Sequence, residues 1–143
     1  MSVAVILRGK PDRLIGLEEN RSLAEAAQLL SRERIGALIV RNKAGDMIGI
    51  LSERDIVRVL AERGAAVLDE PVSAVMTRKV ISCKPSDTVG AIMEMMTSGK
   101  FRHLPVIDDS RVVGLISIGD VVKWRVMEYE SEQEALRDYI KTA

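Results

Sequence analysis

The stretches GILSERD (residues 49–55) and GLISIGD (residues 114–120) follow one pattern, in which a glycine and two aliphatic residues lead to a serine and then, three positions later, to an aspartate. The first stretch begins at Gly49 and the second at Gly114. Each alone is typical of a strand that runs into a helix, because serine is a favoured N-cap and an acidic residue at N3 completes a capping box. Their recurrence indicates an internal repeat.

Further matches extend this repeat over most of the chain. Ser22 and Leu23 correspond to Thr88 and Val89, and RIGALIV (34–40) corresponds to KFRHLPV (100–106) at the same offset. The apolar lead-in VAVIL (3–7) corresponds to VSAVM (72–76) at a slightly larger offset. The sequence therefore predicts a first repeat over residues 3–65, a second over residues 70–127 and a helical tail over residues 128–143.

Each repeat has the residue pattern of a β–α–β–β–α unit that follows a short helical turn. Helices are expected after the cap residues Ser22, Ser52, Thr88 and Ser117. Strands are expected where short apolar runs are bounded by turn formers, at residues 14–17, 37–40 and 47–51 and at residues 80–83, 103–106 and 112–116. The fold class is therefore α/β (α+β), with two repeats that bury their apolar faces against each other.

Composition narrows the possible functions. The 143 residues carry 21 basic and 21 acidic side chains, so no basic excess points to nucleic acid, and the 3% of aromatic residues provides few stacking platforms. One cysteine and one histidine allow neither an internal disulfide nor a multi-cysteine metal site. The N-terminal apolar run of five residues is too short for a signal or a membrane span. We expect a cytoplasmic protein that binds no membrane and is not an enzyme.

The Ser-x-x-Asp stretches have two compatible interpretations. The serine and the aspartate can do no more than cap a helix. Alternatively, the free N–H groups and the positive dipole end of the helix can attract a phosphate, while an ionised aspartate accepts hydrogen bonds from the two hydroxyls of a ribose. Phosphate and ribose together are parts of a nucleotide.

The chain resembles a tandem pair of CBS domains, a Bateman module, over about residues 3–127. The resemblance rests on the duplicated pattern, the two Ser-x-x-Asp stretches and RHLPV at residues 102–106. The resemblance implies that the repeats pack by pseudo-two-fold symmetry. It also implies two clefts that bind adenosine-containing ligands such as AMP, ADP, ATP, S-adenosylmethionine or NAD(H). Each cleft is expected to combine the Ser-x-x-Asp of one repeat with strand edges of the other.

The resemblance assigns residues to both clefts. Cleft one is expected to contain Ser52, Arg54, Asp55, Val80, Phe101, Arg102, His103 and Pro105. Cleft two is expected to contain Leu14, Ile35, Gly36, Ala37, Ser117, Ile118, Gly119 and Asp120. Gly119 stands where cleft one has Arg54, so we expect the tighter phosphorylated ligand, AMP first and NAD(H) or ATP as alternatives, in cleft one.

The tail adds an expectation about assembly. Val122, Val126, Tyr129, Leu136 and Ile140 recur at steps of three or four residues once Gln133 is counted between Tyr129 and Leu136, which predicts an extended amphipathic helix. That helix either folds back on its own module or contacts a second copy, and the resemblance favours a homodimer. The expected function is regulatory: the module binds a nucleotide and signals to an effector protein in trans. The alternative is a structural dimerisation or interaction module with vestigial clefts.

Overall fold

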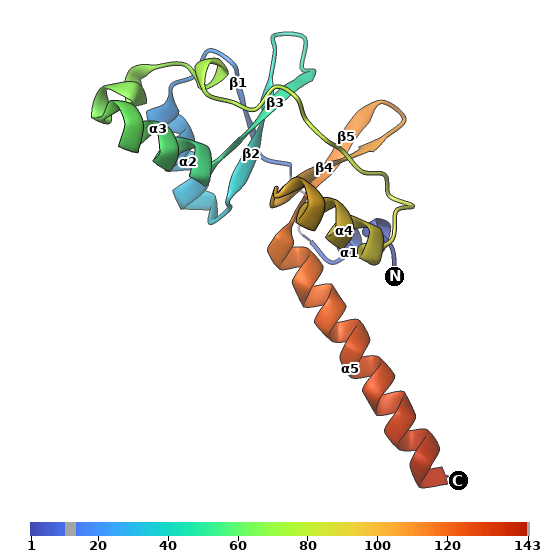
Figure 1. The fold of residues 1–143 in the computed structure, drawn as a ribbon. Helices are drawn as coiled ribbons and strands as arrows, with labels where there is room; N and C mark the ends of the chain where they lie inside the picture. Colours follow the sequence, from blue (N-terminus) through green and yellow to red (C-terminus); the bar gives the residue numbers. More distant parts are fainter. Residues whose placement is uncertain (11–13, 143) are drawn as a thin grey trace. The chain divides into compact units, whose positions relative to one another are not determined.

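The computed structural model describes residues 1–10 and 14–142 (Figure 1). The chain forms two compact units. The first-repeat unit is Arg13–Ile81, and the second-repeat unit combines Met1–Asp12 with Ser82–Ala143. The lead-in to the first repeat therefore packs within the unit of the second repeat, and the lead-in to the second repeat packs within the unit of the first.

The first-repeat unit has the predicted β–α–β–β–α order. The sheet order is β1-β2-β3, with β1 parallel to β2 and β2 antiparallel to β3. The elements are β1 (Gly16–Glu18), α2 (Leu23–Glu33), β2 (Ala37–Arg41), β3 (Met47–Ser52) and α3 (Glu53–Arg63), followed by the 3₁₀ turns η1 (Ala65–Asp69) and η2 (Val72–Ala74). The strand expected at residues 14–17 begins later, at Gly16.

Among the described residues, the second-repeat unit contains one fewer strand than the first. Its elements are α1 (Val3–Arg8), α4 (Val89–Gly99), β4 (His103–Asp108), β5 (Arg111–Ser117) and α5 (Ile118–Thr142), and β4 pairs with β5 as an antiparallel hairpin. The strand predicted at residues 80–83 is wrong, because only Cys83 forms an isolated parallel bridge, to Val106. Cys83 is 3% exposed whereas Ile81 is 51% exposed, so the segment has no buried face to hold a longer strand against the sheet.

Side-chain caps confirm the predicted helix starts. The Ser22 hydroxyl accepts a hydrogen bond from the Glu25 N–H at 3.2 Å, and the Thr88 hydroxyl accepts one from the Ala91 N–H at 3.1 Å. These bonds satisfy N–H groups that lack a partner in the first helical turn. The repeat is therefore visible in local geometry as well as in sequence.

Each unit has its own apolar core. In the first-repeat unit, Leu38 and Leu51 of the hairpin pack with Leu23 of α2 and Ile56 of α3. The core of the second-repeat unit includes the fully buried Ile6, Ile92, Leu104 and Ile116 together with Val121 and Met96. Met96 is buried, and Met93 packs against this core.

The last helix, α5, is continuous over 25 residues. It begins against α4, α1 and β5 of its own unit and then extends beyond them, as the ribbon shows (Figure 1). Val121 is its buried residue, and Tyr129, Leu136 and Ile140 are all more than half exposed. The tail does not fold back on its module. No helix of the described residues is both long and apolar enough to cross a membrane.

Candidate functional site

The first Ser-x-x-Asp stretch forms a complete capping box where β3 meets α3. The Asp55 N–H donates to the Ser52 hydroxyl at 3.2 Å, and the Ser52 N–H donates to Asp55 Oδ2 at 3.0 Å. Asp55 is 8% exposed, which makes it the buried charged residue of the described chain. The cap interpretation is thus confirmed for this copy.

The cap leaves acceptor capacity on the Asp55 carboxylate. Arg58, one turn further along α3, donates from Nη1 to Asp55 Oδ1 at 3.1 Å. Each carboxylate oxygen therefore has one donor from the chain, while an ionised carboxylate oxygen can accept two. Asp55 can hold its cap and still accept hydrogen bonds from a pair of hydroxyls.

The second Ser-x-x-Asp stretch forms the matching cap where β5 meets α5. The Asp120 N–H donates to the Ser117 hydroxyl at 3.1 Å, and the Ser117 N–H donates to Asp120 Oδ2 at 2.9 Å. Both copies of the motif therefore start their helices in the same way.

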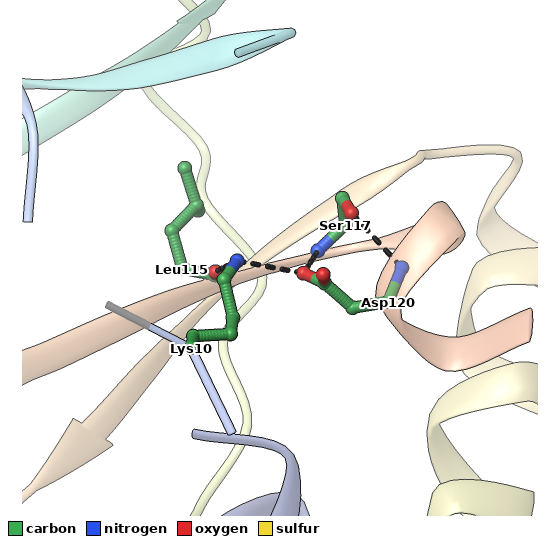
Figure 2. Close-up of polar contacts among 4 residues, drawn as sticks. All are labelled: Lys10, Leu115, Ser117 and Asp120. Atoms are coloured by element: carbon green, nitrogen blue, oxygen red, sulfur yellow. Dashed lines mark hydrogen bonds and ion pairs between the residues drawn. The ribbon is translucent and has the colours of Figure 1, made fainter. Parts of the chain in front are cut away.

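Lys10 makes the second copy different from the first. Its ammonium group donates to Asp120 Oδ2 at 2.7 Å and to the Leu115 carbonyl oxygen at 2.8 Å, as Figure 2 shows. Burial of Asp120 raises its pKa, but the hydrogen bonds from Lys10 and Ser117 and the charge of Lys10 outweigh burial and hold the pKa below its ordinary value. The carboxylate proposed for ribose in this copy is already paired with a cation of the same chain.

The repeat contains an equivalent of Lys10 that is used differently. Lys79 follows the second lead-in at the position that Lys10 takes after the first, so the offset of the two lead-ins also relates the two lysines. The ion-pair partner of Asp55 is nevertheless Arg58 of its own helix, at 3.1 Å. Sequence reasoning missed both Lys10 and Arg58. The shared offset of the two lysines is the signal that could have drawn attention to Lys10.

The strand edges assigned to the clefts lie beside the caps. In the first-repeat unit, Ala37 pairs with Ser52, and the Glu53 N–H donates to the Gly36 carbonyl oxygen at 2.9 Å. In the second-repeat unit, His103 pairs with Ser117, and the Ile118 N–H donates to the Arg102 carbonyl oxygen at 2.8 Å. Each unit thus brings together the motif assigned to one cleft and the strand edge assigned to the other.

The remaining assigned residues differ in exposure. Arg54, Arg102, Ile118 and Gly119 are exposed, whereas Pro105 is buried within β4. Leu14, Ile35, Val80, Phe101 and His103 are half-buried. The two arginine side chains are therefore accessible to an anionic ligand, whereas Pro105 is a buried part of the strand edge.

The described residues offer little for covalent or metal chemistry. They contain no group of three or more histidine, cysteine or acidic side chains arranged to hold a metal ion. Burial, and to a smaller extent the charge of Asp87, raises the pKa of the Cys83 thiol to about 12. Cys83 is therefore protonated at neutral pH and unsuited to act as a nucleophile.

Comparison with protein families places these features in context. The family model for the CBS domain matches residues 12–62 and 72–126. The chain belongs to the CBS-domain family and carries two copies of the domain. The match indicates no catalytic family.

Individual proteins agree with this assignment. The chain is 35% identical over 122 residues to the CBS domain-containing protein CBSX3, mitochondrial, of Arabidopsis thaliana, covering 82% of this chain and 59% of that protein. It therefore spans less than two thirds of that relative. The crystal structure of the CBS-domain containing protein ATU1752 from Agrobacterium tumefaciens is 42% identical, with a TM-score of 0.84 over 87% of this chain and 92% of that one.

Two similar structures were solved with adenosine compounds. The CBS domain pair of protein MJ0100, in complex with 5′-methylthioadenosine and S-adenosyl-L-methionine, is 27% identical, with a TM-score of 0.79 over 90% of this chain and 98% of that one. The CBS domain protein PAE2072 from Pyrobaculum aerophilum, complexed with AMP, is 25% identical, with a TM-score of 0.74 over 84% and 89%. CBS pairs of this fold therefore include proteins that bind adenosine ligands.

Proposed function

We propose that this chain is a non-enzymatic regulatory module that binds an adenosine-containing nucleotide and reports its presence to an effector protein in trans. AMP is the preferred ligand, and NAD(H) and ATP are the alternatives. We place the module in the cytoplasm as a homodimer. The observation that carries the proposal is the Asp55 carboxylate, which lies at the N-terminus of α3 and whose two oxygens each accept one hydrogen bond from the chain and can each accept another.

In this proposal, different residues of cleft one contact the ribose, the phosphate and the base of the nucleotide. Asp55 accepts hydrogen bonds from the ribose hydroxyls, because an ionised carboxylate can only accept. The N-terminus of α3, the Ser52 hydroxyl and the exposed Arg54 face the phosphate, and Arg102 or His103 assists them. The backbone near Val80, Phe101 and Pro105 frames the base.

We assign weaker binding, or none, to cleft two. A ribose diol that approaches Asp120 has to share the carboxylate with the Lys10 ammonium group or displace it. Ser117, Ile118 and Gly119 provide no cation in place of Arg54. Leu14 and the edge formed by Ile35, Gly36 and Ala37 supply apolar and backbone contacts only, so the phosphate has fewer partners there.

One observation favours a second candidate function. Both aspartates are already engaged by donors of the chain itself, Asp55 by Arg58 and Asp120 by Lys10. This arrangement also suits a structural dimerisation or interaction module whose clefts are vestigial. Such a module needs its caps for folding and has no requirement for a ligand.

Thermal unfolding with a ligand panel separates the two functions. The panel is AMP, ADP, ATP, NAD, NADH and S-adenosylmethionine, each added well above the protein concentration. A ligand at about 100 times its Kd adds about 2.7 kcal/mol to the free energy of unfolding. For a chain of this size that raises the melting temperature by roughly 5–11 °C. An unchanged melting temperature with every compound at millimolar concentration would favour the structural module.

A further inference from the structure

A row of side chains on α5 has the spacing of a coiled-coil seam. Steps of alternately four and three residues separate its members, which gives the 3.5-residue average of a heptad repeat. The apolar members are 48 to 65% exposed, although the helix is fully formed. The seam consists of Val122, Val126, Tyr129, Gln133, Leu136 and Ile140.

The seam is separate from the face that α5 uses within its own unit. Val121 is buried in the core of the second-repeat unit, and Trp124 packs against the same core. Glu128, on that side too, holds the N-terminal ammonium group of Met1 at 3.3 Å. Because the positions 121, 124 and 128 already anchor α5, the seam remains available to another helix.

We propose that α5 pairs with α5 of a second copy of this chain in a parallel, in-register, two-stranded coiled coil. This pairing deepens the homodimer of the proposed function and is independent of nucleotide binding. Val126, Gln133 and Ile140 take the a positions, and Val122, Tyr129 and Leu136 take the d positions. Branched Val and Ile at a, with Leu at one of the d positions, favour two strands over three or four.

The charges beside the seam select the parallel orientation. In a parallel pair, each g residue faces the e residue five positions later on the other helix. Arg125 then faces Glu130 of the second copy, and Glu132 faces Arg137 of the second copy, so both contacts join opposite charges. Symmetry doubles each contact.

An antiparallel pair would bring like charges together. With Val126 packed on Leu136 of the second copy, the two helices run past each other with their crossing point near residue 131. Glu130 then approaches Glu130 and Glu132 approaches Glu132, while Lys123 approaches Arg137. The same side chains thus support one orientation and oppose the other.

Gln133 fixes the register of the parallel pair. In the single chain its Nε2 donates to the Tyr129 hydroxyl at 2.8 Å. In register, the two Gln133 side chains meet at the same a layer and can hydrogen-bond each other. A shift by one heptad leaves each amide against an apolar layer, which is unfavourable for a polar group removed from water.

Cysteine cross-linking tests orientation and register directly. We expect Leu136→Cys to form a covalent dimer with a short bis-maleimide reagent, because in-register d positions face themselves. A mixture of Val126→Cys and Leu136→Cys should give no heterodimer cross-link beyond random collision. Unmodified protein is the control, since the thiol of Cys83 is buried. Absence of the Leu136→Cys dimer, or efficient cross-linking of position 126 to position 136, would overturn the proposal.

Charge reversal tests the g–e charge contacts that favour the parallel orientation. Glu132→Arg places two arginines together at each g–e contact and should weaken dimerisation on the order of tenfold in sedimentation equilibrium. The double variant Glu132→Arg with Arg137→Glu restores opposite charges and should recover the original dimerisation constant. Failure of the second change to rescue the first would contradict the parallel pairing.

A further pair of variants tests whether the dimer uses another surface instead of α5. Leu136→Asp should give a monomer, whereas Ala135→Asp, on the adjoining exposed face of α5, should leave the dimer intact. A dimer that survives Leu136→Asp would place the interface elsewhere, for example on the exposed Val57 side of α3, and would sink the α5 pairing. Because the test reads assembly state, and the ligand panel reads melting temperature, each proposal can fail alone.

Discussion

Asp55 combines a structural task with a proposed binding task in one side chain. It accepts from the Ser52 N–H and from Arg58, and its carboxylate oxygens retain unused acceptor positions. Replacement by alanine would remove cap and ligand contact together and would confuse the two. Replacement by asparagine keeps an oxygen that can still cap the helix and removes the charge.

Asp55→Asn and Asp120→Asn form a matched pair of variants. We expect Asp55→Asn to lose most of the AMP-induced rise in melting temperature, because an amide presents a single acceptor oxygen where the carboxylate presents two. Asp120→Asn should keep that rise, because Lys10 already occupies Asp120. Thermal unfolding with and without AMP measures both. Equal losses in the two variants would contradict the inequality of the clefts.

The Lys10–Asp120 contact predicts a pH dependence. The folded-state pKa of Asp120 lies below its ordinary value, so the ionised form contributes stability above the unfolded pKa, near 3.9, and this contribution is lost as the pH falls through the folded value. Lys10→Gln should lower the free energy of unfolding at pH 7 by at most about 1 kcal/mol, since the pair is partly exposed.

Urea unfolding at pH 7 and pH 3 measures this difference. The gap between the original protein and Lys10→Gln should shrink at pH 3, below the ordinary pKa of an aspartate, because the contribution of the ionised Asp120 is lost as the pH falls toward its lowered folded-state pKa. The bond from Lys10 to the Leu115 carbonyl oxygen does not involve the Asp120 carboxylate and leaves a small remainder. A gap that is equal at both pH values would show that the charge of Asp120 is not what Lys10 stabilises.

Cys83 provides a probe of the second-repeat core. Its thiol is 3% exposed, and burial, followed by the charge of Asp87, raises its pKa to about 12. We expect alkylation at pH 8 to be slow in the folded protein and fast in urea, because the thiolate is the reactive form. Rapid labelling of the native chain, followed by mass spectrometry, would contradict the burial of this residue.

At the scale of elements, hairpins and capped helices could be predicted, because local residues determine them. Ser22, Thr88 and the two Ser-x-x-Asp stretches cap helices at the predicted positions. The strand expected at residues 80–83 does not form. Its composition suits a strand, but the segment does not have the continuous buried face that would hold a strand against the sheet.

The sequence pattern did not predict which residues far apart in the chain contact each other. The apolar lead-in at residues 3–7 aligns with residues 72–76 in the sequence, yet no local signal says which repeat each lead-in packs against. The same limit hid the contact between Lys10 and Asp120, which lie far apart in the chain. The cap of each candidate site was predictable, and the long-range cation beside Asp120 was not.

The position of α1 predicts which unit a destabilising substitution in this helix affects. Ile6 is fully buried in the core of the second-repeat unit, so Ile6→Ala should cost about 2–5 kcal/mol of stability. Hydrogen exchange should accelerate in α4, β4 and β5 more than in β1, β2 and β3. Arg8→Ala, at an exposed position of the same helix, is the control. Faster exchange confined to the first-repeat sheet would contradict the placement of α1.

At the scale of the whole molecule, each proposed cleft draws residues from both units. The assignment of cleft one from the family resemblance includes Ser52, Arg54, Asp55 and Val80, which belong to the first-repeat unit, and Phe101, Arg102, His103 and Pro105, which belong to the second. A nucleotide that binds such a site links the units, and it can shift their arrangement only by its difference in affinity between the states. In the proposed function, this difference in affinity is what turns nucleotide binding into a signal.

Isothermal titration with AMP and with 2′-deoxy-AMP tests the central claim most directly. If Asp55 holds the ribose, AMP should bind, and the deoxy compound should bind roughly ten- to a hundredfold more weakly, because a hydrogen bond to a charged group is lost. Equal affinity for the two compounds would contradict the account that Asp55 holds the ribose, and no heat from AMP at millimolar concentration would contradict AMP as the ligand.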